Sequence, residues 1–128
     1  MAENVLPSFV DAWLASWTGN HPEVLLEFYT RDVFYLDPAN PKGLTGKEQL
    51  SAYLKKLLQK NPHWKWTREE IFPTEKGFTL KWKAEIPTAG ENLILYGLDI
   101  VEMTGDKISR NEVYFDRYDW LMKLTLNK

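Results

Sequence analysis

Residues 33–48, VFYLDPANPKGLTGKE, hold the local signals from which the fold can be worked out. Val33 to Leu36 is a β-branched and aromatic run typical of a strand. The proline that follows forces Asp37 into an extended conformation at the end of this strand. The segment ANPKGLTG carries two clusters of Pro or Gly and predicts a loop. Thr45 and Glu48 have the spacing of a capping box, which predicts the start of a helix.

Two helical segments precede this strand, and one follows it. Apolar residues recur at spacings of three and four from Pro7 to Trp17, which predicts a helix that ends at Thr18-Gly19. Asn20 can cap a short second helix that has Pro22 in its first turn. The third helix follows the capping box, and its apolar stripe continues until Asn61-Pro62 ends it.

The pattern then changes to a period of two, which predicts strands. One face of the first of them carries Trp64, Trp66, Arg68, Glu70 and Phe72. Residues 78–86 alternate between apolar and polar, as a sheet with one wet face requires. Leu93 to Met103 is apolar on nearly both faces and predicts a central strand. A tight turn at Thr104 to Lys107 joins it to a returning strand, Ile108 to Phe115.

This order of elements predicts an α+β fold, with a single domain spanning residues 1–128. Three N-terminal helices should pack on a curved, mostly antiparallel sheet, and Trp120, Leu121 and Leu124 indicate a short closing helix or a tail. At 128 residues, with 44% of them hydrophobic, the chain can bury one core that is stable without disulfide bonds or bound metal ions.

Composition excludes several classes of site. The chain has no cysteine, which rules out disulfides, thiolate metal sites and cysteine nucleophiles. His21 and His63 have no partner at ligand spacing, so we expect no metal, and no cofactor motif is found. The net charge of −2 favours neither nucleic acid nor an anionic membrane. The start MAENVLPSFV lacks a basic n-region, and we expect a soluble, cytoplasmic protein.

The aromatic content is 14%, with six residues each of Trp, Tyr and Phe. So many rings either fill a small core or line a cavity within it, and composition leaves both open.

Three pieces in order resemble a known superfamily: a strand ending VFYLDP, the run GLTGKE, and the ending GDKISRNEVYFDRYDWL. Over nearly its whole length the chain resembles the nuclear-transport-factor-two-like superfamily, in its SnoaL-like and ketosteroid-isomerase-like branch. The resemblance implies a cone-shaped roll whose sheet and helices enclose an apolar pocket. It further implies a hydrophobic small-molecule ligand and a homodimer formed through the outer sheet face.

The same resemblance implies site residues for proton transfer of isomerase or cyclase type. Asp37 matches the general base of ketosteroid isomerases, and Asp99 matches the protonated acid of their oxyanion hole. Trp13 falls where the family has a tyrosine, and its indole N–H is a far less acidic donor than a phenol. The residues expected to bind the ligand are Trp17, Tyr53, Trp66, Leu95, Gly97, Asn111 and Tyr114.

The residues around Asp37 and Asp99 also allow interpretations that do not depend on the resemblance. An ionised Asp99 among apolar neighbours would be costly to bury, so it lies in a pocket with a raised pKa, faces an outer surface, or pairs with an arginine. Asp37 before a proline is equally typical of a turn former that binds backbone N–H groups.

Other members of the superfamily match less well. Limonene epoxide hydrolases have an arginine where this chain has Gly97, and SnoaL-type cyclases have an acid near Val113. Glu112 is adjacent, but a shift of one residue in register would turn it to the other face. The sequence therefore does not determine on which face of the sheet Glu112 and Asn111 lie.

Two non-enzymatic functions remain as alternatives. The missing phenol at Trp13 favours a ligand-binding or dimerisation module without catalysis. Lys55 to Arg68 interleaves basic and aromatic residues, as a single-strand nucleic-acid platform does, although the leucine stripe of the helix accounts for the lysine spacing.

Overall fold

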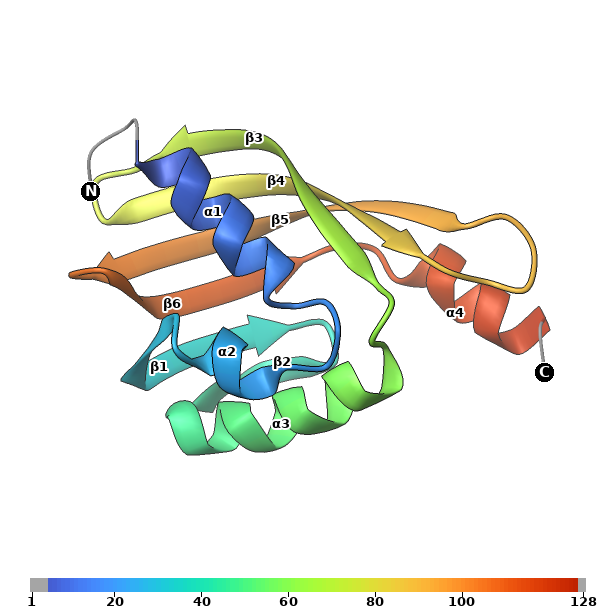
Figure 1. Cartoon of the computed structure of the whole chain (residues 1–128), viewed down its shortest axis with the longest axis horizontal. Helices are drawn as coiled ribbons and strands as arrows, with labels where there is room; N and C mark the ends of the chain where they lie inside the picture. Colours follow the sequence, from blue (N-terminus) through green and yellow to red (C-terminus); the bar gives the residue numbers. More distant parts are fainter. Residues whose placement is uncertain (1–4, 127–128) are drawn as a thin grey trace.

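The computed structural model describes residues 5–126, so residues 1–4 and 127–128 of the predicted 1–128 domain lie outside the described residues. Along this part of the chain, the elements are α1 (Leu6–Ala15), α2 (Pro22–Leu26), β1 (Tyr29–Asp37), β2 (Asn40–Thr45), α3 (Lys47–Lys60), β3 (Lys65–Pro73), β4 (Gly77–Ile86), β5 (Leu93–Thr104), β6 (Lys107–Tyr114) and α4 (Tyr118–Leu126) (Figure 1).

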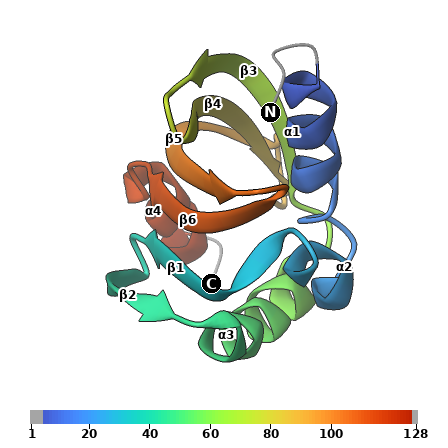
Figure 2. The ribbon, with the colours of Figure 1, turned by 90° about the vertical axis from the view of Figure 1, so that its left-hand side faces the viewer.

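The six strands form one sheet in the order β2-β1-β6-β5-β4-β3. β1 runs parallel to β6, and every other neighbouring pair is antiparallel. Figure 2 shows the sheet curling from β3 round to β2, with α1, α2 and α3 along its open side. The predicted α+β roll with a curved, mostly antiparallel sheet is confirmed.

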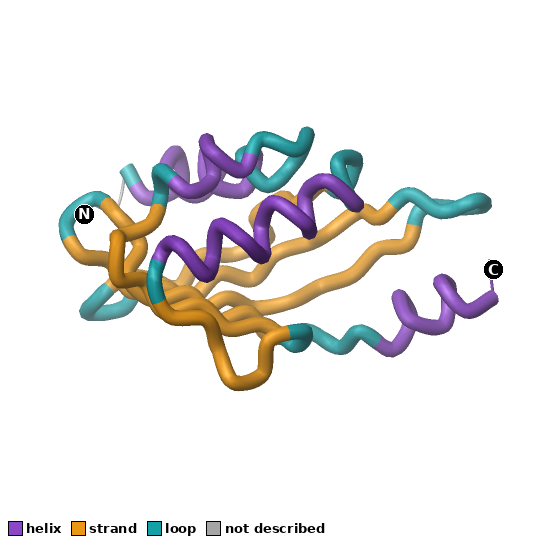
Figure 3. Tube along the Cα trace, turned by 90° about the horizontal axis from the view of Figure 1, so that it is seen from below, coloured by secondary structure: helices purple, strands orange, loops and turns teal. Residues whose placement is uncertain are grey.

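The helices pack through the apolar stripes that the sequence predicts. α3 buries Leu50, Leu54 and Leu58 completely, and α1 buries Val10 and Trp13. Burial of such side chains contributes about 1.5–3 kcal/mol each, which fixes both helices on the concave face of the sheet. α4 lies apart from the other helices and extends past the strand ends (Figure 3).

The predicted loop at residues 39–46 is wrong, because most of it forms the edge strand β2, paired with β1. An edge strand tolerates Pro41, since a missing N–H on its outer side breaks no ladder bond. Gly43 has a φ of +84°, and a Cβ there would lie 2.4 Å from the ring of Phe34. The missing side chain of Gly43 therefore leaves room for the Phe34 ring to pack over β2.

Both predicted helix caps are also wrong. Gly46 is the N-cap of α3, and the backbone N–H of Thr45 donates to the side chain of Gln49 rather than forming a capping box with Glu48. The N-cap of α2 is a histidine, because Asn20 has a φ of +59° and belongs to the turn before it.

The face predicted for residues 64–72 is correct only in its first half. The register of β3 against β4 shifts between Arg68 and Glu70, which marks a bulge. Beyond the bulge the facing reverses: Ile71 packs against the core, and Phe72 is 45% exposed. A strict period of two cannot predict such an extra residue.

Candidate ligand-binding cavity

A cavity of about 700 Å³ lies between the concave face of the sheet and helices α1 and α3. Its wall is mostly aromatic and aliphatic. The aromatic members are Trp17, Tyr35, Tyr53, Trp64, Trp66, Trp82, Phe115 and Trp120, and the aliphatic ones include Leu14, Leu57, Ala84, Ile86, Leu95 and Val113. The high aromatic content of the chain therefore serves a cavity as well as a core.

The cavity opens where α3 and β4 end, because the lining residues there are exposed. The ends of both elements lie towards the right of Figure 1. The exposed members of its lining, Ala39, Lys60, His63 and Pro87, define what we call the mouth. α4 begins beside the mouth. Its Trp120 packs edge-on against Trp64, with ring centroids 5.2 Å apart.

Asp99 lies in the cavity wall and is only 5% exposed. Its Oδ1 accepts a hydrogen bond from Trp82 Nε1 at 2.7 Å, and its Oδ2 accepts one from Asn111 Nδ2 at 2.9 Å. Burial raises the pKa of Asp99 to about 7, against the opposing effect of these two hydrogen bonds. Both the neutral and the charged acid are therefore populated near neutral pH.

A one-way chain of hydrogen bonds, which we call the relay, runs from α1 to Asp99. Trp13 Nε1 donates to Tyr29 Oη at 3.2 Å, Tyr29 Oη donates to Asn111 Oδ1 at 2.9 Å, and Asn111 donates to Asp99. An indole can only donate, so every proton in the relay points towards Asp99. Both carboxyl oxygens thus already accept a bond, and the proton of the neutral acid has the cavity as its open side.

Gly97 explains how Trp82 reaches Asp99. The two residues Trp82 and Gly97 are paired across β4 and β5, and a Cβ on Gly97 would lie 2.2 Å from the indole ring. The missing side chain lets the indole lie across the neighbouring strand. Gly97 is therefore outside the lining and shapes the site through Trp82.

Asp37, also buried in the cavity wall, is the acceptor of five hydrogen bonds. Its Oδ1 accepts from the backbone N–H groups of Ala39 and Asn40 and from the Asn40 side chain, at 2.9–3.0 Å. Its Oδ2 accepts from the hydroxyls of Tyr35 at 2.7 Å and Tyr53 at 2.6 Å. Burial, together with the nearby carboxylate, raises the pKa of both tyrosines. The turn-forming interpretation of Asp37 matches these bonds, with two phenols held in addition.

The structure brings six of the ten predicted site residues into the lining: Trp17, Asp37, Tyr53, Trp66, Leu95 and Asp99. Trp13 is fully buried behind the cavity and has no hydrogen bond to Asp99, which it reaches only through Tyr29 and Asn111. Asn111 is likewise buried behind Asp99 rather than exposed to a ligand.

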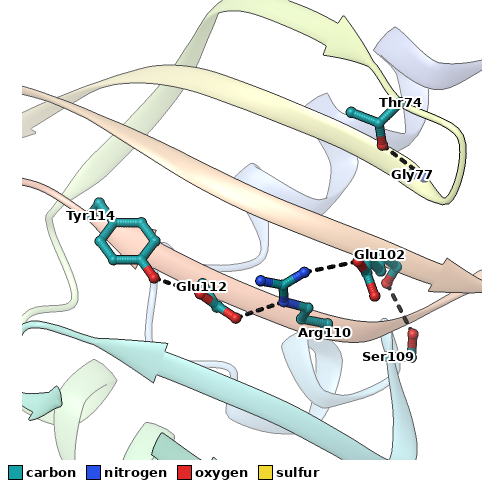
Figure 4. Close-up of polar contacts among 7 residues, drawn as sticks. All are labelled: Thr74, Gly77, Glu102, Ser109, Arg110, Glu112 and Tyr114. Atoms are coloured by element: carbon teal, nitrogen blue, oxygen red, sulfur yellow. Dashed lines mark hydrogen bonds and ion pairs between the residues drawn. The ribbon is translucent and has the colours of Figure 1, made fainter. Parts of the chain in front are cut away.

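The register of β6 settles the facing of its residues. Val113 faces the cavity, so Glu112 and Tyr114 lie on the outer face, where Tyr114 is 45% exposed and donates to Glu112. Figure 4 shows Arg110 between Glu112 and Glu102 on this face, with N–O distances of 2.6 and 2.8 Å. Tyr114 therefore has no place in the cavity, and Glu112 does not replace the cyclase acid.

Several functional residues were missed at the level of sequence. Trp82 and Tyr35 carry the expected inward alternation, but only strand pairing shows that they donate to Asp99 and Asp37. The role of Tyr29 could not be inferred, because it depends on Asn111, which lies 82 residues further along the chain.

The basic and aromatic segment Lys55 to Arg68 does not form an exposed stacking surface. Trp64 and Trp66 line the cavity and contact each other, with ring centroids 5.8 Å apart. Arg68 forms an ion pair with Asp11, with 2.7 Å between Nε and Oδ1. Within residues 5–126, no group of three His, Asp or Glu is placed to hold a metal ion. In the same part of the chain, no helix has the length and apolar character of a membrane span.

Comparison with known proteins agrees with this architecture. A family model for the SnoaL-like domain matches residues 10–111. A search of curated protein sequences finds no significant match.

Many solved structures share the fold. A protein with a ketosteroid isomerase-like fold from Catenulispora acidiphila DSM 44928, in complex with trimethylamine, has a TM-score of 0.78 at 23% identity, covering 91% of this chain and 92% of that one. TerC, co-crystallised with polyporic acid, has a TM-score of 0.76 at 15% identity, covering 92% and 96%. An NTF2-like protein from Burkholderia pseudomallei K96243 has a TM-score of 0.78 at 12% identity, covering 98% and 99%.

Proposed function

This chain belongs to the SnoaL-like domain family, and we propose that its cavity binds a hydrophobic small molecule and exchanges a proton with it through Asp99. The observation that carries the proposal is a buried acid in the wall of a 700 Å³ apolar cavity. Apolar cavities with a few convergent polar groups are the usual form of small-molecule sites. Trimethylamine and polyporic acid in two structurally similar proteins support a small-molecule ligand.

The chemistry we infer is proton transfer at an activated carbon, of isomerase or cyclase type. A proton-transfer group works best when its pKa lies near the working pH, and the pKa of Asp99, about 7, meets that condition. As a neutral acid, Asp99 can donate to a ligand oxygen that gains charge. The proton that leaves the carbon would go to Asp37, the base that the resemblance to ketosteroid isomerases assigns, and the five hydrogen bonds of Asp37 also anchor Tyr35 and Tyr53.

The alternative is a binding module without turnover. The missing phenol at Trp13 supports it, since an indole stabilises an oxyanion less well than a phenol. A panel of ring ketones with an activated α-carbon, followed by absorbance for double-bond migration, separates the two. Migration that is lost in Asp99→Asn supports catalysis, and binding without migration supports the module.

Binding itself is tested with N-phenyl-1-naphthylamine, a neutral apolar fluorophore. We expect its fluorescence to rise on binding, and Ala84→Leu to weaken its affinity about tenfold because the larger side chain takes up cavity volume. Ala12→Leu makes the same chemical change on the exposed side of α1 and should leave affinity unchanged. Equal affinity in all three proteins would place the probe outside the cavity and contradict the proposal.

We also propose that two copies pair through the outer sheet face. Four exposed apolar residues on β5 and β6, Ile94, Tyr96, Leu98 and Tyr114, form what we call the outer patch. Leu98 lies opposite Tyr114 in the register, so the patch is continuous across the two strands. Exposed apolar patches of this kind mark interfaces, and a two-fold axis can pair the patch with itself.

Light scattering should therefore give twice the 15.0 kDa chain mass. Leu98→Lys should reduce the mass to that of one chain, because two lysines would be buried against each other. Val24→Lys, a similar change on exposed α2, should leave the dimer intact. A mass of 15.0 kDa for the unmodified protein at all working concentrations would rule out this dimer.

A further inference from the structure

The cavity wall holds two buried acids, and basic residues lie near its mouth. The acids of its lining, Asp37 and Asp99, are buried at 6% and 5% exposure. Three basic residues lie at the open end: Lys60 and His63 are exposed members of the mouth, and Arg117, directly before α4, is half-buried beside them. A ligand that fills the cavity therefore meets carboxyl groups in the wall and cations where the cavity opens.

The cations at the mouth have no acid of their own. Within the described residues, the ion pairs are His21–Glu23, Asp11–Arg68 and those of Arg110, so neither Lys60 nor Arg117 takes part in one. The acids that share the lining are already engaged, Asp37 by five donors and Asp99 by two. A half-buried guanidinium without a carboxylate is a vacant anion partner.

Arg117 faces the cavity rather than bulk solvent alone. Burial and the Asp37 carboxylate raise the pKa of Tyr53, and the charge of Arg117 acts on that hydroxyl in the opposite direction. The guanidinium therefore lies within electrostatic reach of a cavity hydroxyl. Trp120, three residues later and on the first turns of α4, contributes an aromatic wall at the same place.

Lys60 and Asn61 offset part of the negative end of α3. The negative end of the helix dipole points at the mouth, and Lys60 in the last turn offsets it. The Leu57 carbonyl accepts from both the backbone and the side chain of Asn61, so its two acceptor positions are used within the chain.

We propose that the cavity is built for an apolar anion, with the flat apolar body among the tryptophans and a carboxylate, sulfonate or phosphate group at the mouth between Lys60 and Arg117. This inference rests on the proposed small-molecule function. An anion is partly hydrated at the mouth and has two cations there, whereas beside Asp99 it would face a buried carboxyl group in an apolar wall. The charged group thus fixes the direction in which the ligand enters, with its uncharged end towards Asp99.

The test compares two probes that differ by one charged group. 8-Anilinonaphthalene-1-sulfonate has the ring system of N-phenyl-1-naphthylamine with a sulfonate added. We expect the sulfonate to bind about tenfold more tightly at low salt, as a charge-assisted contact with Arg117 and Lys60 implies. Added salt should reduce this preference and leave the affinity of the neutral probe almost unchanged.

Variants then assign the preference to residues. Arg117→Gln should weaken the sulfonate about tenfold, and Lys60→Gln about threefold because that side chain is exposed. The neutral probe should lose less affinity than the sulfonate in both variants, because it has no charge for these residues to bind. Lys55→Gln is the matched control, since Lys55 is exposed on the same helix outside the lining.

Equal affinity of the two probes for the unmodified protein would overturn the inference, and so would an equal loss for both probes in Arg117→Gln. Either result is compatible with binding of a neutral ligand in the cavity, so the proposed function would still stand. If the neutral probe fails to bind, or binds as well to Ala84→Leu, the proposed function itself fails.

Discussion

The free energy of unfolding of the unmodified protein should fall by about 4 kcal/mol between acidic and alkaline pH, and Asp99→Asn should not show this fall. The loss arises because burial raises the pKa of Asp99 from 3.8 in an unperturbed carboxyl to about 7 in the folded protein. Between these values the folded state holds a proton that the unfolded chain has released. The contribution of Asp99 is fully present below pH 3.8 and is lost as the pH rises through about 7.

The variant should start from a lower stability at acidic pH. An amide at position 99 would turn its N–H groups towards Trp82 or Asn111, which are both donors, and one buried donor would lose its acceptor at a cost of about 1–3 kcal/mol. Because the amide does not titrate, this difference should close or reverse by pH 8.

Urea unfolding at fixed pH values from 4 to 8 measures both stabilities. Asp32→Asn, at an exposed position on β1, is the control and should follow the unmodified protein. The indole N–H resonance of Trp82 gives a second readout, because its acceptor changes charge, and it should titrate with a midpoint near 7. Parallel stability curves for Asp99→Asn and the unmodified protein would show that Asp99 is charged throughout this range.

The sequence was sufficient for most of the fold because its signals there are local. The stripe of α3 and the alternation of β4 are set by helix and strand geometry, and both are where periodicity predicts them. The features that it could not give depend on pairing. β2 pairs with β1 and has Phe34 packed over Gly43, and the bulge after Arg68 lies where the register of β3 against β4 shifts. Neither interaction leaves a periodic trace.

The site divides in the same way. Asp99 stands out in sequence because a carboxylate among apolar residues needs an explanation, and the structure places it in the cavity wall. Its partners could not be inferred, since Trp82 reaches it only across Gly97 and Asn111 only across β5 and β6. The grouping of Lys60 and Arg117 could not be predicted either. They are 57 residues apart in sequence, and only the folded chain brings both into the lining of one cavity.

Asp37→Ala should be more destabilising than the loss of a single turn-forming bond, which is worth about 1 kcal/mol. The change removes the acceptor of both phenols and of two backbone N–H groups. Tyr35 is 2% exposed, so its hydroxyl cannot turn to water, and we expect a total cost of about 3 kcal/mol.

Asp37→Asn should cost less than Asp37→Ala, because its carbonyl oxygen can keep the three N–H donors. Its amide N–H groups would face the two phenol hydroxyls, which are also donors, so the part of the cost that comes from the phenols remains. Urea unfolding of both variants at pH 7, with the neutral naphthylamine probe as a check of the cavity, measures this difference.

The same two variants decide between an anchor and a general base. A carboxylate that anchors Tyr35 and Tyr53 should leave any ketone turnover of Asp37→Asn within about tenfold of the unmodified protein, since the phenols keep their positions. A general base would behave differently: its loss lowers turnover by about 10²–10⁴-fold with little change in stability or affinity. Such a loss in Asp37→Asn would support Asp37 as the base, because a saturated turn carboxylate has no reason to affect turnover without affecting the fold.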